Sequence, residues 1–263
     1  MNDGAVDPIQ SALREAGRIA LRFHRHAVPE RKSDGSPVTE ADHAVERFLV
    51  GALGELFPDD GVVSEEGRGR PSRTGATWHV DPIDGTSAFV AGLAYWGPTI
   101  CRVDAEGRLQ MGGFYVPRLD EMWWAVRGEG AWRDGVRLPR VQPGPLDPSD
   151  VLFVSSRVHR GPPLPWHGKI RALGSAAAHL ALVAAGGGKA ALVARWKLWD
   201  VGCGVLLAEE TGHIVTDLSG RPIDPAVCSD GLPLLVGVPT ASEQLSAYDA
   251  PARPRVTQAG RNG

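Results

Sequence analysis

Hydrophobic positions near the start of the chain recur at the spacing of two amphipathic helices. Apolar residues repeat every three or four positions from Ile9 to Phe23, which predicts a helix over about residues 8 to 27. A second apolar stripe runs from residue 45 to residue 56. Thr39 precedes it with Asp42 three residues later, and this capping pattern marks where the second helix begins. The chain therefore opens with two helices.

Short apolar runs separated by turn residues follow, as is typical of strands. Hairpin signals at Glu106-Gly107 and Asp134-Gly135 lie within a strand-rich stretch from 98 to 140. Further strands are predicted at residues 61–65, 77–81, 151–155, 189–195, 214–217 and 234–238. Helices are predicted at 175–185 and 200–210, with a short one from Ser87. Helices and strands therefore alternate in the second half of the chain.

A segment rich in proline, glycine and aspartate, at about residues 142–150, separates the two halves. At 263 residues the chain is long enough to bury a substantial core. We expect a single domain over residues 1–250 with sub-lobes of about 1–145 and 146–250, and a flexible tail over 251–263.

Composition narrows the possible partners. The net charge is −3, so the chain lacks the basic field that nucleic-acid polymers require, whereas a small phosphorylated molecule is compatible with it. Cys101, Cys203 and Cys228 are odd in number and far apart, which argues against a disulfide framework and a structural zinc site. No apolar run approaches the roughly 20 residues of a membrane span. We therefore expect a cytoplasmic protein without a membrane partner.

The segment Asp81-Pro82-Ile83-Asp84-Gly85-Thr86 carries the strongest chemical signal. Two carboxylates stand three residues apart beside a glycine and a hydroxyl, and the proline prevents a helix there. Both carboxylates can converge on one point, where oxygen ligands suit Mg²⁺. An isolated segment of this kind is also typical of a turn whose aspartates bond their own backbone amides.

Further acidic residues favour the metal site over the simple turn. Asp42 lies near the start of the second helix, Glu65 and Glu66 end a strand, and Asp200 follows a tryptophan in an apolar stretch. With no cluster of lysine or arginine nearby, these carboxylates would repel one another unless divalent ions neutralised them. Such ions can polarise a phosphoryl group and acidify water. Thr86 could orient that water, and the amides that follow Gly85 could bind phosphate.

In four segments the sequence resembles the inositol monophosphatase family of Mg²⁺-dependent, lithium-sensitive phosphatases. Residues 32–42, K-S-D-G-S-P-V-T-E-A-D, are similar to the family's first loop. Residues 63–67 resemble its G-E-E element, with Ser64 in place of the first glycine. Residues 78–89 match D-P-I-D-G-T-x-x-F, and residues 198–212 resemble W-D-x-A-G…E-A-G-G. Four motifs in the right order are far more specific than any one of them.

The resemblance implies an α+β fold, the layered αβαβα sandwich of this family, usually a homodimer, and it implies roles for individual residues. The implied ligands of two or three Mg²⁺ ions are Glu65, Asp81, the carbonyl of Ile83, Asp84 and Asp200. Asp42 and Thr86 would activate the nucleophilic water, and Gly85 and Thr86 would donate amides to phosphate. Gly174-Ser175-Ala176 resembles the segment that contacts the alcohol part of the substrate.

Departures from the family pattern concern the substrate. Val193 stands seven residues before Asp200, where inositol-specific members carry a glutamate. Residues 96–99 and 122–131 look similar to histidinol-phosphate phosphatases of the same family. Arg195 and Lys197 are candidate substrate contacts, although a solvated role is equally compatible with their positions. The expected reaction is hydrolysis of a small phosphorylated alcohol by metal-activated water, with inositol monophosphate, histidinol phosphate, a sugar phosphate or an adenosine bisphosphate as the substrate.

Two other classes of protein share some of these features. Haloacid dehalogenase phosphatases place their aspartates as D-x-D-G-T, but Pro82 stands where their nucleophile would be. A catalytically silent metal binder of the same fold is the other, because fold does not guarantee activity. His24 and His26, near the end of the first helix, are expected to face solvent or the helix dipole instead of binding metal.

Overall fold

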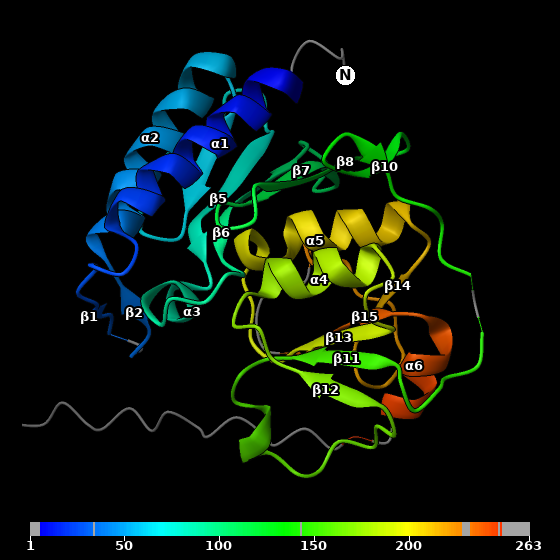
Figure 1. The fold of residues 1–263 in the computed structure, drawn as a ribbon. Helices are drawn as coiled ribbons and strands as arrows, with labels where there is room; N and C mark the ends of the chain where they lie inside the picture. Colours follow the sequence, from blue (N-terminus) through cyan, green and yellow to red (C-terminus); the bar gives the residue numbers. More distant parts are fainter. Residues whose placement is uncertain (1–5, 34, 143, 228–231, 247, 249–263) are drawn as a thin grey trace, which may run out of the picture.

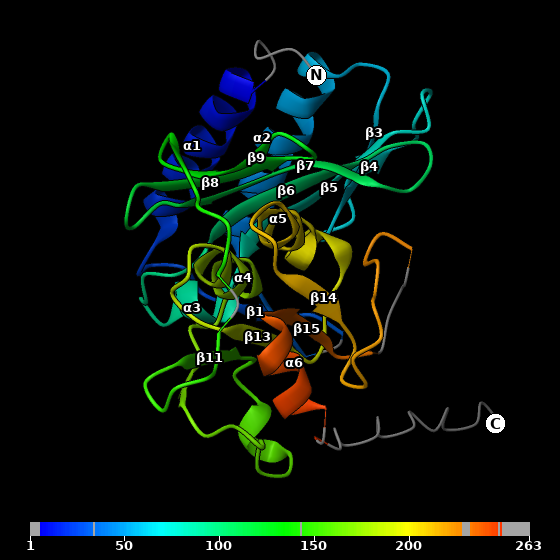
Figure 2. The same cartoon turned by 90° about the vertical axis from the view of Figure 1, so that its right-hand side faces the viewer.

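The computed structural model describes residues 6–33, 35–142, 144–227, 232–246 and 248. In this structure helices and sheets alternate in five layers, a helix pair, a large sheet, a second helix pair, a smaller sheet and a final helix (Figures 1 and 2). This confirms the predicted α+β fold with αβαβα layering. The predicted tail at 251–263 and Cys228 lie outside the described residues.

The helices and strands follow the predicted order. The first helix layer contains α1 (Val6–Phe23) and α2 (Glu40–Leu56), and the second contains α4 (Ala176–Ala184) and α5 (Leu198–Glu210). The large sheet has the order β10 (Val136–Arg137), β9 (Gly130–Arg133), β8 (Glu121–Val126), β7 (Leu109–Val116), β6 (Gly97–Val103), β5 (Thr77–Asp84), β3 (Gly61–Ser64) and β4 (Gly69–Arg70). The smaller sheet has the order β12 (Lys169–Arg171), β11 (Val151–Val154), β13 (Ala190–Val193), β15 (Leu234–Gly237) and β14 (Ile214–Thr216). The remaining elements are β1 (Glu30–Arg31), β2 (Pro37–Val38), α3 (Thr86–Val90), the 3₁₀ turn η2 (Val158–Arg160) and α6 (Pro239–Leu245).

Polar residues gather at the carboxyl ends of two pairs of parallel strands. β3 runs parallel to β5 in the large sheet, and β11 runs parallel to β13 in the smaller one. Parallel neighbours bring their carboxyl ends to one edge, which is where ligands bind in sheets of this kind. Glu65 and Asp84 therefore lie near each other after β3 and in β5, and Ser155 lies beside Ala194 after β11 and β13, where the Ala194 amide donates to Ser155 Oγ at 3.2 Å.

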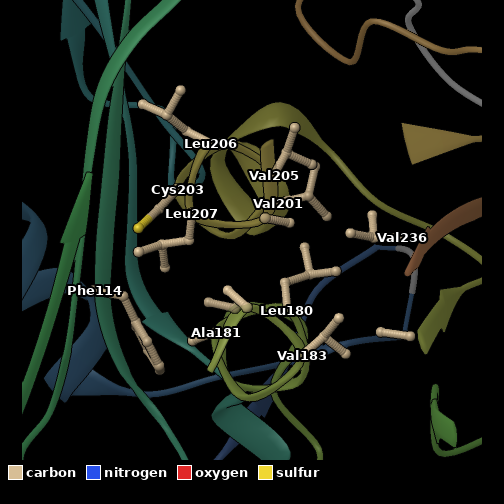
Figure 3. Packing of buried hydrophobic residues seen from close by; sticks show 14 of the residues in the cluster. Phe114, Leu180, Ala181, Val183, Val201, Cys203, Val205, Leu206, Leu207 and Val236 are labelled. Carbon is tan, nitrogen blue, oxygen red and sulfur yellow. The ribbon is translucent and has the colours of Figure 1, made fainter. Parts of the chain in front are cut away.

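The middle helix layer packs against both sheets. Side chains of α4 and α5, including Leu180, Val183 and Cys203, face one another and the flanking strands (Figure 3). Phe114 of the large sheet and Val236 of the smaller one belong to the same buried cluster. Both sheets are therefore covered from the inside by one helix pair.

Two local predictions need correction. The first helix ends at Phe23 instead of near residue 27, because the chain turns there and Arg25 takes a left-handed conformation with φ of 71°. His24 does not face solvent. It is buried, with its ring centroid 5.2 Å from that of Trp96 and 5.4 Å from that of Phe89.

The strand ending at the D-P-I-D segment is longer than predicted. β5 continues to Asp84 rather than ending at Asp81, and its register against β6 shifts between Asp81 and Asp84. Pro82 lies in this irregularity, as expected for a residue that cannot donate a ladder hydrogen bond. The bulge re-aims the two carboxylates relative to a regular strand.

Two of the three cysteines lie among the described residues. Cys101 and Cys203 are buried free thiols. Within the described ranges, none of the helices combines the length and the apolar character needed to cross a lipid bilayer.

Candidate active site

Three acidic side chains converge at the edge of the large sheet. Glu65 follows β3, Asp81 lies in β5, and Asp200 is in the first turn of α5. One carboxylate oxygen from each lies within 4.8 Å of the others. The Lys197 amide donates to Asp200 Oδ2 at 2.7 Å, and the Ile83 amide donates to Asp81 Oδ1 at 2.9 Å, so the backbone fixes two of the three carboxylates.

The electrostatics of this cluster are unfavourable when it carries no cation. Burial, followed by the neighbouring carboxylates of Glu65, Asp84 and Asp200, raises the pKa of Asp81 well above its usual value. Burial and the charge of Asp84 likewise raise the pKa of Asp200. A site that resists ionisation in this way gains most from a bound cation.

Asp84 makes a different set of contacts. Its Oδ2 accepts hydrogen bonds from Ser175 Oγ and from the Ala177 amide, the latter at 2.8 Å, and its Oδ1 accepts from the Ala176 amide at 3.3 Å. Burial raises the pKa of Asp84 to about 6 although these hydrogen bonds act to lower it. Asp84 thus lines the same pocket as the cluster while its carboxylate is held by the start of α4.

Glycines allow the two segments to approach this closely. Gly85 has φ of 89°, and a Cβ there would stand 3.1 Å from the Ser175 Cβ. Gly174 has φ of 94°, and a Cβ there would stand 3.0 Å from the Ala88 Cβ. A side chain at either position would be strained by the backbone and would push α4 away from Asp84.

The buried Asp42 and the half-buried Thr86 form a second pair. Thr86 Oγ1 lies 3.3 Å from Asp42 Oδ1 and 3.2 Å from the Ile83 carbonyl oxygen, both of which can accept its proton. Thr39 donates to Asp42 Oδ2 from its amide at 2.8 Å and from its hydroxyl at 2.6 Å. Burial raises the pKa of Asp42 even though the bonds from Thr39 oppose that shift. Thr86 Oγ1 donates its one proton toward these two acceptors, so the lone pairs of Oγ1 remain available to a ligand in the pocket.

The sequence showed no cluster of lysine or arginine near the carboxylates, but the fold brings one lysine from a distant segment to them. Lys32 Nζ lies 2.7 Å from Glu65 Oε1 and also contacts Glu66 Oε1. Burial acts to lower the pKa of Lys32, but the hydrogen bonds to Glu65 and Glu66 outweigh it and raise that pKa. Lys32 therefore balances the Glu65 side of the cluster, and the charge of Lys197 acts to lower the pKa of Asp200, but burial and the neighbouring carboxylates still raise it.

A pocket of about 230 Å³ joins these groups. Of the residues singled out from the sequence, it is lined by Glu65, Asp81, Ile83, Asp84, Gly85, Thr86, Gly174, Ser175, Ala176, Val193, Arg195 and Asp200. Asp42 is not among the lining residues and contacts the pocket through Thr86.

Three lining residues were missed from the sequence, Ser155, Ser156 and His179. The two serines directly follow an apolar strand, which is the position that could have drawn attention to them. His179 lies one helical turn after Ser175, on the same face of α4. Its Nε2 accepts a hydrogen bond from the Leu173 amide at 2.9 Å, and burial lowers its pKa to about 4, so the ring is neutral.

The donor set fits hard divalent cations. Glu65, Asp81 and Asp200 supply carboxylate oxygens, and the Ile83 carbonyl lies at the same edge. Oxygen donors with several negative charges favour Mg²⁺ over softer metals, which prefer sulfur and nitrogen ligands. Neither of the two described cysteines, Cys101 and Cys203, lines the pocket, and the neutral His179 already accepts a hydrogen bond at Nε2.

Comparison with known proteins decides the family. The model of the inositol monophosphatase family matches residues 6–250. The chain belongs to this family. The match covers both sheets and every residue of the pocket, and it confirms the resemblance found in the four motifs.

Relatives within the inositol monophosphatase family carry phosphatase names. A histidinol-phosphatase of Chlorobaculum parvum is 32% identical over 217 residues, covering 79% of this chain and 83% of that protein. A fructose-1,6-bisphosphatase/inositol-1-monophosphatase of Thermotoga maritima is 32% identical over 219 residues, covering 80% and 83%. Among solved structures, the Thermotoga maritima IMPase superposes with a TM-score of 0.80 at 26% identity, covering 92% of this chain and 94% of that one.

Proposed function

We propose that this member of the inositol monophosphatase family is a Mg²⁺-dependent phosphomonoesterase that releases phosphate from a small phosphorylated alcohol. The observation that supports the proposal best is that Thr86, which is hydrogen-bonded to Asp42, lines one pocket together with the three-carboxylate cluster. Glu65, Asp81, Asp200 and the Ile83 carbonyl would hold the ions, with Asp84 as a further ligand. When bound, Mg²⁺ would polarise the phosphoryl oxygens and make water more acidic.

The side chains supply positioning and proton transfer. The Thr86 hydroxyl accepts a hydrogen bond from the attacking water and passes its own proton toward Asp42, which Thr39 holds in place. A carboxylate whose pKa is raised by burial is a better base at neutral pH than an exposed one. The Gly85 and Thr86 amides, at the start of α3, would bind phosphate oxygens.

Asp84 joins the two halves of the site. It is bonded to Ser175 and to two amides of α4, so the alcohol side of the pocket is positioned relative to the acidic side. Gly174, Ser175, Ala176 and Arg195 would contact the alcohol. The relatives named as histidinol-phosphatase and inositol-1-monophosphatase support a phosphorylated alcohol as the substrate class.

Phosphate release tests this function. The wild-type protein should release phosphate from monoesters only with Mg²⁺ present, and Asp84→Asn and Asp200→Asn should each abolish release while the circular dichroism spectrum is unchanged. Asp120→Asn is a matched control, because Asp120 lies outside the pocket and its left-handed backbone (φ of 54°) suits asparagine. Near-native turnover in either pocket variant would refute the ligand assignment. Metal binding without turnover on any monoester would favour a silent metal binder.

Three finer features belong to the same proposal. Occupancy by two or three Mg²⁺ ions would be counted by calorimetric titration. A homodimer would be detected by light scattering coupled to size exclusion. A cytoplasmic location would be checked by fractionating cells that express the chain.

A further inference from the structure

The two sides of the pocket carry opposite charge. The acidic lining residues are Glu65, Asp81, Asp84 and Asp200. They form the part of the pocket that we propose binds the metal ions and the phosphate group. A second part of the lining, called the wall below, comes from the residues at the ends of β11 and β13 and from α4, namely Ser155, Ser156, His179, Val193 and Arg195. That wall contains no carboxylate, and its histidine is neutral.

The sequence around the wall residues is also basic. The 49 residues from Val151 to Trp199 contain neither aspartate nor glutamate, in a chain whose net charge is −3. They contain seven basic residues, namely Arg157, Arg160, Lys169, Arg171, Lys189, Arg195 and Lys197. The alcohol side of the pocket is therefore built entirely from a basic segment.

Arg195 is the basic side chain that this segment presents to the pocket. It follows β13, next to the serines that follow the parallel strand β11. In the described part of the chain, no hydrogen bond or ion pair engages its guanidinium, and its side chain is exposed. Every other arginine or lysine among the described residues is outside the pocket lining. An unpaired guanidinium with hydroxyl neighbours is suited to bind an oxyanion in a bidentate manner.

We propose that Arg195, with Ser155 and Ser156, selects phosphomonoesters whose alcohol part carries a second anionic group, a carboxylate or a phosphate. This rests on the proposed phosphatase function and narrows its substrate class. A neutral polyol leaves the guanidinium without a charged partner, and an alcohol bearing an amine places a cation against it. Val193 offers such an amine or a ring hydroxyl no acceptor.

Paired substrates of nearly equal size test the charge preference. 2-Phosphoglycerate has a carboxylate where glycerol 2-phosphate has a hydroxymethyl group. Fructose 1,6-bisphosphate has a phosphate where fructose 1-phosphate has a hydroxyl group. Histidinol phosphate supplies the cationic case. We expect kcat/KM to be about tenfold or more higher for the anionic member of at least one pair, with histidinol phosphate no better than glycerol 2-phosphate. The pair that shows the preference identifies carboxylate or phosphate as the second group.

Variants of Arg195 connect the preference to this residue. Arg195→Met should reduce the ratio of the two kcat/KM values in the preferred pair by about tenfold, and Arg195→Lys should retain an intermediate ratio. Arg171→Met is the matched control, since it removes one charge from the same basic segment outside the pocket and should leave the ratio unchanged. Binding gives a second readout. In the Asp42→Asn background, calorimetry should show tighter binding of the anionic member, and adding Arg195→Met should remove that difference.

The outcomes separate the two proposals. Phosphate release without preference for either anionic member, or an equal loss on both members of a pair in Arg195→Met, would overturn the role of Arg195 and leave the phosphatase intact. The second result would show that Arg195 contacts the phosphate that is released. Absence of Mg²⁺-dependent release from all five compounds would overturn the proposed function itself.

Discussion

The position of the Thr86 hydroxyl leads to a specific prediction about kcat. Its hydroxyl bridges Asp42 and the Ile83 carbonyl, at 3.3 and 3.2 Å, and faces the pocket. Thr86→Ala should lower kcat by about 10² to 10⁴, with little change in KM, because it removes a group that acts on the attacking water. Thr86→Ser, which keeps the hydroxyl, should recover much of the rate. Steady-state kinetics with a monoester measures both constants, and a change confined to KM would contradict the assigned role.

His179 controls stability in acid rather than chemistry. Its folded pKa of about 4 lies below the ordinary value of 6.5 because the ring is buried. The neutral ring is therefore favoured by folding, so its contribution is complete above pH 6.5 and is lost as the pH falls through 4. The linked change amounts to about 3 kcal/mol.

Substituting His179→Gln should weaken this acid dependence, since an amide oxygen can accept the Leu173 hydrogen bond and does not titrate. Urea unfolding at pH 7 and pH 4 measures the free energy of unfolding of both proteins. Between these two pH values the wild type should lose about 3 kcal/mol more than the variant. His79 and His213 also have lowered pKa values, but they are common to both proteins. Equal losses would show that protonation of His179 is not coupled to unfolding.

Residues within a motif were easier to predict from the sequence than their partners across the chain. Thr39 with Asp42, and Asp81 with Asp84, are local patterns whose spacing carries meaning by itself. The bond from Ser175 to Asp84 joins residues 91 apart, and that from Lys32 to Glu65 joins residues 33 apart. The periodicity of hydrophobic residues does not predict such contacts, because they depend on how the sheets and helices stack.

At the scale of elements, a glycine in α5 allows this helix to pack closely against α4. A Cβ on Gly204 would stand 2.3 Å from the Leu180 Cβ of α4, a distance that the helix pair cannot accommodate unchanged. Gly204→Ala should therefore destabilise the protein by about 1 to 3 kcal/mol despite the better helix propensity of alanine. Gly51 in α2 is the matched control, because a Cβ there meets nothing within 4 Å. Gly51→Ala should stabilise by about 0.5 to 1 kcal/mol.

Denaturant unfolding of the two glycine variants decides whether the helix contact is as close as described. Opposite signs for Gly204→Ala and Gly51→Ala are the expected result. Stabilisation by both would mean that α4 and α5 can separate at little cost, and the position of Ser175 against Asp84 would then be less firmly set.

Elements with strong periodicity were predicted well, and those set by tertiary context were not. α2 agrees with its apolar stripe and its Thr39 start, and both hairpins lie where their glycine signals indicate. β12 was missed because Lys169-Ile170-Arg171 is exposed throughout and has no alternating pattern. The extension of β5 to Asp84 was missed because proline usually ends a strand, whereas here a bulge accommodates it.

At the scale of the whole molecule, metal should act on stability as well as on rate. Glu65 and Asp81 come from the large sheet, and Asp200 comes from the helix layer behind it, so an ion held by all three links two layers. Mg²⁺ at about a hundred times its dissociation constant should stabilise the fold by about 2.7 kcal/mol, raising Tm by about 5 °C or more. EDTA should reverse this shift.

Scanning calorimetry with and without Mg²⁺ measures the effect, and Asp200→Asn should make Tm insensitive to the ion. An identical Tm in Mg²⁺ and EDTA for the wild type would argue against an ion that bridges the layers. The control Asp120→Asn should respond as the wild type does.

The middle helix pair has a consequence for any attempt to divide the chain. α4 and α5 come from the second half of the sequence, yet they cover the inner face of the large sheet, which comes from the first (Figure 1). Gly112 of β7 lies so near α5 that a Cβ there would stand 2.6 Å from the Cys203 Cα. A chain cut between residues 144 and 150 would give two fragments with complementary apolar surfaces. Each fragment should aggregate when refolded alone, and the pair should recover solubility and activity when refolded together.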